Sequence, residues 1–189
     1  TRIEARGLSD DVKVTIGCLK ALGARVNVAH DVIEVVGPDS FPESAVLDCG
    51  ESGSTLRFFL PVVAALGITT TFRMAESLYA RPHQPLLDQL TQHGCAVSTQ
   101  LGEISVSDQL LPGTFSLPAD MSSQYLSGLL MALPLLYGQS VIELDGPIES
   151  YGYVNMTLDT LEQANIDIEE DELSFTIPGN QTYFSPSTV

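Results

Sequence analysis

Basic residues are scarce in this chain. Of its 189 residues, 8 are Lys or Arg and 24 are Asp or Glu, so the formal net charge is −16. Nucleic acids and anionic membrane surfaces bind concentrated basic patches, which so few cations can hardly supply. We therefore expect no nucleic-acid partner and no membrane partner, and we interpret the excess carboxylates as a solvated surface. The scarcity also makes each arginine informative, because any anion site must gather several of them.

Long apolar runs are missing as well. The longest candidate, Phe58–Leu66, is far shorter than the roughly 20 residues that a membrane-spanning helix needs. The N-terminus has no basic stretch followed by an apolar one, so we expect no signal peptide. With 44% hydrophobic residues and a mean hydropathy of +0.17, the chain should form one domain with a full core.

Cysteine is rare and follows no ligand pattern. The three cysteines are odd in number, lie far apart and fall in helical or strand runs: Cys18, Cys49 and Cys95. This distribution predicts buried, reduced thiols in a cytoplasmic protein. The three histidines have no metal-ligand spacing, so we expect no metal ion. The Gly/Ser stretch near residue 52 is neither a Walker loop nor a dinucleotide fingerprint, and we expect no cofactor.

What the sequence does contain is an internal repeat. Residues 45–108 predict a strand, a helix, a strand, a helix and two strands, and residues 112–180 predict the same order. The last two strands of the second copy are expected at Ile166–Ile168 and Leu173–Ile177. Residues 1–40 predict only the final four elements of the unit. We therefore expect a single domain over 1–189 whose first unit is incomplete, through trimming or an early natural start.

Two of the expected helices are apolar on all sides. Phe58–Leu66 and Leu126–Leu136 carry almost no charge, and a helix that is apolar all round is buried all round. They occupy equivalent places in the two full units, which predicts an α/β (α+β) domain turned inside out, with buried helices and outer sheets. The second helices, Gln84–His93 and Tyr153–Ala164, are more amphipathic and are expected on an outer or domain-facing side.

Polar residues open both apolar helices. Gly50–Arg57 joins a strand to a helix through a Gly/Ser turn, and Met121–Tyr125 stands at the equivalent place in the next unit. Unpaired N–H groups and the dipole at a helix N-terminus favour a bound anion. Ordinary N-capping by the serines is the alternative for each segment.

The second helices open on polar residues too. Arg81, in Tyr79–Pro82, has a planar guanidinium that suits a carboxylate or phosphate, although a solvated surface charge is the alternative. Glu149–Tyr153 brings hydroxyls to the equivalent place, with packed tyrosines that bind no ligand as the alternative. Because the repeat brings the four openings to one edge, we predict a site for a small polyoxygenated anion.

These motifs resemble the enolpyruvyl transferases, and within them the EPSP synthase family (3-phosphoshikimate 1-carboxyvinyltransferases). The resemblance covers essentially the whole chain and rests on Ser9–Asp11, Gly50–Arg57, Arg81–Leu86, Ser122–Tyr125 and Ser150–Leu158. It implies transfer of the enolpyruvyl group of phosphoenolpyruvate to the 5-hydroxyl of shikimate 3-phosphate, in the shikimate pathway to chorismate and the aromatic amino acids. It also implies two domains of three units each that close on substrate, this chain being the N-terminal one.

The resemblance further implies which residues bind. Shikimate 3-phosphate would contact Ser54, Ser122, Ser123, Gln124, Ser150 and Tyr153. Phosphoenolpyruvate, or glyphosate in its place, would be held by Gly53, Arg81 and Gln124, while Arg57 would support its loop. Many members have Asn where this chain has Glu51, so the resemblance does not carry anion binding over to this position. The family's Lys-Ser motif and its catalytic Asp and Glu would lie outside this chain, so we expect no catalytic residue here and an inactive fragment.

Two other functions stay open at this point. A UDP-N-acetylglucosamine enolpyruvyl transferase shares the superfold, although the Ser122–Tyr125 and Ser150–Tyr153 motifs favour the shikimate branch. A non-catalytic module that binds a small phosphorylated ligand is the alternative from another class. RNA 3′-phosphate cyclases have related repeats, but the net charge of −16 argues against nucleic acid.

Overall fold

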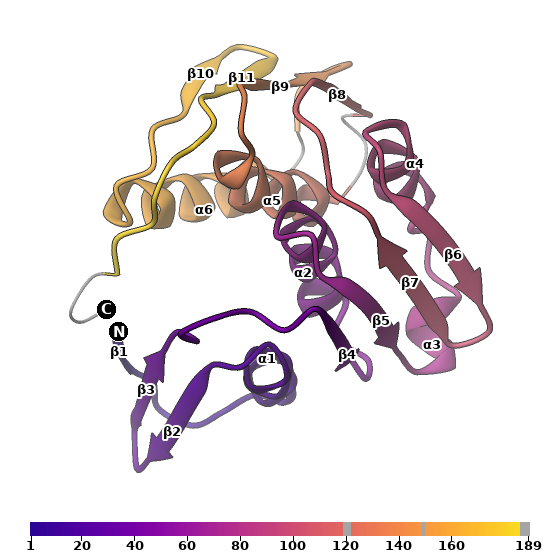
Figure 1. The fold of residues 1–189 in the computed structure, drawn as a ribbon. Helices are drawn as coiled ribbons and strands as arrows, with labels where there is room; N and C mark the ends of the chain where they lie inside the picture. The colour runs from indigo at the N-terminus through magenta and orange to yellow at the C-terminus, as the bar shows by residue number, and fades with distance from the viewer. Residues whose placement is uncertain (119–121, 149, 186–189) are drawn as a thin grey trace.

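The computed structural model describes residues 1–118, 122–148 and 150–185. Met121 and Glu149, which belong to two of the polar motifs, lie outside the described residues. Three separate sheets form, one from each part of the repeat (Figure 1).

The first part of the chain folds into a helix and a three-stranded antiparallel sheet. The sheet order is β1-β3-β2, and β1 pairs only with β3 among the described residues. The side chain of Ser9 accepts a hydrogen bond from the backbone N of Val12 and so caps the helix. The elements are β1 (Arg2–Glu4), α1 (Asp10–Ala21), β2 (Arg25–Ala29) and β3 (Val32–Val36).

The second part forms a four-stranded sheet of order β4-β5-β7-β6. The first pair is parallel and the other two pairs are antiparallel. A short helix that the sequence did not predict, α3, precedes α4. The elements are β4 (Ser44–Asp48), α2 (Gly53–Ala65), β5 (Thr69–Arg73), α3 (Glu76–Tyr79), α4 (Gln84–Gln92), β6 (Ala96–Gln100) and β7 (Glu103–Ser107).

The third part repeats this connectivity. Its sheet has the order β8-β9-β11-β10, again with one parallel pair followed by two antiparallel pairs. The order β1-β3-β2 of the first sheet corresponds to β5-β7-β6 and β9-β11-β10. The elements are β8 (Thr114–Leu117), α5 (Ser123–Ala132), η1 (Leu133–Leu135), β9 (Ser140–Leu144), α6 (Tyr151–Gln163), β10 (Glu169–Asp171) and β11 (Ser174–Ile177).

The two apolar helices form the centre of the molecule, as predicted. Figure 1 shows α2 and α5 side by side, with the sheets on the outside. Leu56 and Leu60 of α2 and Leu129 of α5 are fully buried. The helices approach closely at Gly128, where an added Cβ would lie 2.4 Å from the carbonyl oxygen of Arg57. The fold class is therefore confirmed: helices inside, sheets outside.

Several predicted boundaries were wrong; α6, for example, begins at Tyr151 and not at Tyr153. The strand expected at Ile166–Ile168 lies at Glu169–Asp171, because Gln181 bonds both the backbone N and the carbonyl oxygen of Asp167 and takes the place of a sheet partner. The helix expected to run to Leu136 ends as an α-helix at Ala132 and continues as the 3₁₀ turn η1, which contains Pro134. Proline has no N–H to donate to the preceding turn.

No helix in the described part of the chain combines the length and the hydropathy needed to cross a bilayer.

Candidate functional site

The start of α2 is a tightly bonded polar turn. Ser52 is the N-cap: its Oγ accepts from the backbone N of Thr55 at 3.4 Å and lies 2.8 Å from the hydroxyl of Thr55. Thr55 in turn bonds Thr15 of α1 at 2.8 Å. Ordinary capping, left open by the sequence, thus accounts for Ser52. Ser54 is half-buried, with its hydroxyl 3.3 Å from that of Ser52, and is not the cap.

Gly53, the first residue of α2, lies against two guanidinium groups. A Cβ added there would be 3.1 Å from Nη1 of Arg57 and 3.4 Å from Nη1 of Arg81. Neither arginine forms an ion pair with a carboxylate in the described residues. Two unpaired cations beside a helix N-terminus create a locally positive site in a strongly acidic chain.

Arg57 is buried, with 8% of its surface exposed. Its Nη1 donates to Oε1 of Gln124 at 2.7 Å, and its guanidinium carbon lies 5.2 Å from the ring centroid of Tyr125. Among the described residues, the Nε of Arg57 has no hydrogen-bond partner. Arg57, expected to support its own loop, therefore contacts the next unit of the repeat.

The start of α5 faces that of α2. Ser122 caps α5, its Oγ accepting from the backbone N of Gln124 at 3.4 Å. Ser123 is buried and Gln124 half-buried. The hydroxyl of Tyr125 donates to the carbonyl oxygen of Pro82, which ties α5 to the turn that carries Arg81. The structure thus brings together three of the four predicted helix openings.

The start of α6 completes the group. Ser150 is its N-cap residue without making a side-chain capping bond, and Tyr153 is 68% exposed. The packed-tyrosine alternative therefore does not describe Tyr153. A buried bond of 2.8 Å between the hydroxyls of Ser127 and Thr157 joins α5 to α6.

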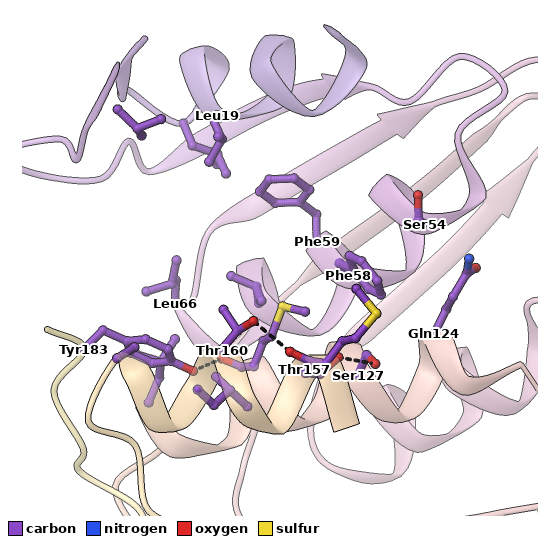
Figure 2. Close-up of a pocket in the computed structure, with 18 of the residues that line it drawn as sticks. Leu19, Ser54, Phe58, Phe59, Leu66, Gln124, Ser127, Thr157, Thr160 and Tyr183 are labelled. Carbon is purple, nitrogen blue, oxygen red and sulfur yellow. Dashed lines mark hydrogen bonds between the residues drawn. The ribbon is translucent and has the colours of Figure 1, made fainter. Parts of the chain in front are cut away.

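One groove of about 1090 Å³ collects the residues predicted for shikimate 3-phosphate. All six line it: Ser54, Ser122, Ser123, Gln124, Ser150 and Tyr153. Figure 2 shows Ser54 and Gln124 near one end and Tyr183 and Leu66 toward the other, with Leu19 of α1 across the opening. Gly53 and Arg81 are not in the lining, so the expected phosphoenolpyruvate residues sit beside the groove, with Gln124 common to both sets.

Most of the groove is apolar. Phe58, Phe59, Leu66 and other apolar residues line it, together with the hydroxyls of Ser127, Thr157 and Thr160. No Asp, Glu, Lys or Arg from the described residues lines it. The described part of the groove therefore offers most of its polar contacts at one end, and no charged group for proton transfer.

His83 and Glu51 complete the surroundings. Burial lowers the pKa of His83; nearby Arg57 and Arg81 lower it further, while the bond from Nε2 to the carbonyl oxygen of Leu78 opposes the shift. The neutral form of His83 is thus favoured, and its buried Nδ1 has no hydrogen-bond partner in the part of the chain that the structure describes. The carboxylate of Glu51 accepts a hydrogen bond from Ser77 of α3 at 2.8 Å, so this departure from the family pattern has a local partner.

The cysteines and possible metal ligands lie apart from this chemistry. All three cysteines are buried and unpaired, as predicted. In the described ranges, no cluster of His, Cys, Asp and Glu has the arrangement of a metal site.

The model of the EPSP synthase (3-phosphoshikimate 1-carboxyvinyltransferase) family matches residues 1–189. The chain belongs to the EPSP synthase family. It is 38% identical over 177 residues to the 3-phosphoshikimate 1-carboxyvinyltransferase of Brachyspira hyodysenteriae, covering 93% of this chain and 42% of the relative. It is 36% identical to that of Methanococcoides burtonii over 186 residues, covering 93% and 43%.

The fold is also that of an EPSP synthase. The solved structure of EPSP synthase from Acinetobacter baumannii matches 100% of this chain and 43% of its own, with a TM-score of 0.80 at 18% identity. The chain thus spans less than half the length of the EPSP synthase relatives it matches.

The structure places most of the predicted site residues together and adds contacts between them that the sequence did not predict. The bond from Arg57 to Gln124, the bond from Ser77 to Glu51 and the buried His83 were not predicted. Only for Arg57 did the sequence hold a signal, since it is one of eight basic residues.

Proposed function

We propose that this chain is the N-terminal, substrate-recognising domain of an enzyme that transfers the enolpyruvyl group of phosphoenolpyruvate to the 5-hydroxyl of shikimate 3-phosphate, releasing phosphate. Family membership over all 189 residues carries the proposal. The convergence of the N-termini of α2, α5 and α6 on one groove supports it, because hydroxyls and N–H groups suit a phosphorylated polyol.

The proposed roles follow from position. Shikimate 3-phosphate binds at the polar end of the groove, with its phosphate at the start of α5, where Ser122 and Ser123 offer hydroxyls. Phosphoenolpyruvate binds beside Gly53, where Arg81 provides an unpaired guanidinium for its carboxylate or phosphate. Gln124, which lines the groove and accepts a hydrogen bond from Arg57, contacts both ligands.

Proton transfer belongs to another part of the enzyme in this proposal. The described groove lining has no ionisable acid or base apart from the phenols of two tyrosines, and general acid–base catalysis needs such groups within hydrogen-bond reach of the reacting atoms. A second, C-terminal domain of the same enzyme would supply them when it closes over the groove. The chain alone then binds substrate without turning it over.

The repeat supports a proposal about the domain as well. In the other two sheets, β5 and β9 are equivalent to β1, and each has a parallel neighbour, β4 or β8. An apolar helix follows each of these neighbours along the chain: α2 after β4 and α5 after β8. We propose that a strand and a helix of this kind complete the first unit, the strand beside β1 and the helix in the apolar part of the groove. Protection of the β1 amides from hydrogen exchange in the longer parent protein, beyond that in this chain, would support this; equal exchange would contradict it.

Phosphate release tests the function. The parent protein should release phosphate from phosphoenolpyruvate when shikimate 3-phosphate is present, and this chain alone should release none. Release with UDP-N-acetylglucosamine as the only effective acceptor would assign the sibling reaction instead. Binding of shikimate 3-phosphate by a parent protein that releases no phosphate with either acceptor would indicate a non-catalytic module.

A further inference from the structure

The side-chain amide of Gln124 has a fixed orientation because of Arg57. A guanidinium only donates hydrogen bonds, so the atom of Gln124 that lies 2.7 Å from Nη1 of Arg57 must be the oxygen. The opposite orientation would set N–H groups against N–H groups. The Nε2 atom therefore lies away from Arg57, and it has no hydrogen-bond partner among the described residues.

We infer that Arg57 is a positioning residue that holds Gln124 as a pure hydrogen-bond donor toward the ligands of the groove. This rests on the proposed function and goes beyond it by giving Gln124 a polarity and Arg57 a role. With its oxygen engaged, Gln124 offers two N–H groups and no acceptor. It therefore selects carboxylate, phosphate or hydroxyl oxygens, and disfavours a ligand that presents a donor at this point.

The surroundings of Arg57 support a positioning role over a general structural one. A buried guanidinium normally pairs with a carboxylate, because an uncompensated buried charge is costly. Arg57 has no such partner in the described residues; its compensation is the amide oxygen of Gln124 and the ring face of Tyr125 at 5.2 Å. A carboxylate in place of that amide would pair better with Arg57 and would remove the donors.

The close approach at Gly53 gives the arrangement a second effect. Nη1 of Arg57 lies 3.1 Å from the Cβ position of Gly53 and Nη1 of Arg81 lies 3.4 Å from it, so the two cations flank one point. The positive charge of Arg57 therefore also attracts an anion bound at Arg81, although Arg57 itself is buried and contacts Gln124. Its side chain acts on the ligand mainly through Gln124, and this field is a smaller contribution that Gln124→Ala leaves in place.

A double-mutant cycle in the parent enzyme tests the role. Arg57→Met and Gln124→Ala should each lower kcat/KM about ten- to a hundredfold, the loss of one charge-assisted hydrogen bond. If Arg57 acts through Gln124, Arg57→Met should cost less than about threefold in the Gln124→Ala background. Equal losses in both backgrounds would overturn the inference. Gln124→Glu should lose as much activity as Gln124→Ala, since it keeps the pairing and removes the donors; retained activity would also overturn it.

A second readout does not depend on turnover. In the parent protein labelled with ¹⁵N-glutamine, the NH₂ signal of Gln124, assigned by its disappearance in Gln124→Glu, should be rigid in the unmodified protein and mobile in Arg57→Lys. Val63→Ala, a core change elsewhere in α2, serves as the matched control and should leave the signal rigid. An amide equally rigid in Arg57→Lys would overturn the inference even if the enzyme proved to catalyse another reaction.

Discussion

Replacement of Gly53 by alanine should separate the two proposed ligands. The added methyl group would lie 3.1 Å from Nη1 of Arg57, 3.4 Å from Nη1 of Arg81 and 3.6 Å from a methyl carbon of Leu78. The first distance is shorter than an ordinary contact, so a guanidinium must shift by a few tenths of an ångström. The contact that must give is the one with Arg57, which Gln124 and Tyr125 hold in place, so the methyl group narrows the space beside Gly53 in which phosphoenolpyruvate is proposed to bind.

The expected effect is therefore on phosphoenolpyruvate. A charge-assisted hydrogen bond contributes about 1.5–3 kcal/mol, and part of it should be lost, which corresponds to roughly a 5- to 30-fold rise in the KM for phosphoenolpyruvate. The KM for shikimate 3-phosphate should change less than about threefold, because the hydroxyls of Ser122 and Ser123 are untouched. Steady-state kinetics of the parent enzyme, with each substrate varied in turn, would measure both values.

Stability should hardly fall in this variant. Gly53 has no positive φ, and alanine is favoured over glycine in a helix by up to about 1 kcal/mol, which offsets the tight contact. Gly17→Ala in α1 is the matched control, because nothing lies within 4 Å of its added Cβ. It should raise stability and leave both KM values unchanged. Equal increases in both KM values for Gly53→Ala, or a loss of more than about 2 kcal/mol in unfolding free energy, would refute the reasoning.

Three further predictions concern packing, pH and thiol chemistry. Gly128→Ala should lower the unfolding free energy by about 1–3 kcal/mol in urea denaturation, because its Cβ would meet the Arg57 carbonyl oxygen at 2.4 Å. Gly152→Ala, whose Cβ would have no described atom within 4 Å, should not destabilise the chain. Similar unfolding curves for both variants would contradict the close packing of α2 and α5. Because burial lowers the pKa of His83 from its ordinary 6.5, the unfolded chain binds the proton first, so the contribution of His83 to stability should be complete above about pH 6.5 and decline as the pH falls through that value. Subtracting the stability profile of His83→Gln should reveal this component, and identical profiles would argue against it. The three thiols should resist a disulfide reagent until urea unfolds the chain, because all of them are buried and burial raises the pKa of Cys95 to about 11. Rapid labelling of any of them in the folded chain would contradict this.

The sequence predicted the elements well where local signals agreed. Residues 45–108 and 112–180 fold in the predicted order of strands and helices, with α3 and η1 as short additions. The error at residues 166–168 has a tertiary cause, because Gln181, fourteen residues after Asp167, bonds that backbone and no local pattern encodes such a contact. The repeat predicted which helix openings meet, since equivalent positions in similar units face one centre.

The contacts within the site were less predictable for a physical reason. The sequence motifs identify Arg57 and Gln124 as candidate site residues but not the bond between them. That bond joins residues 67 positions apart and depends on how closely α2 and α5 approach at Gly128. A larger residue at Gly128 would separate the helices and lengthen the bond that orients Gln124. The chemistry of the site thus depends on helix packing as well as on motif residues. Gly128→Ala should therefore disturb ligand binding along with stability, whereas a core change distant from Arg57, such as Val63→Ala, should affect stability alone.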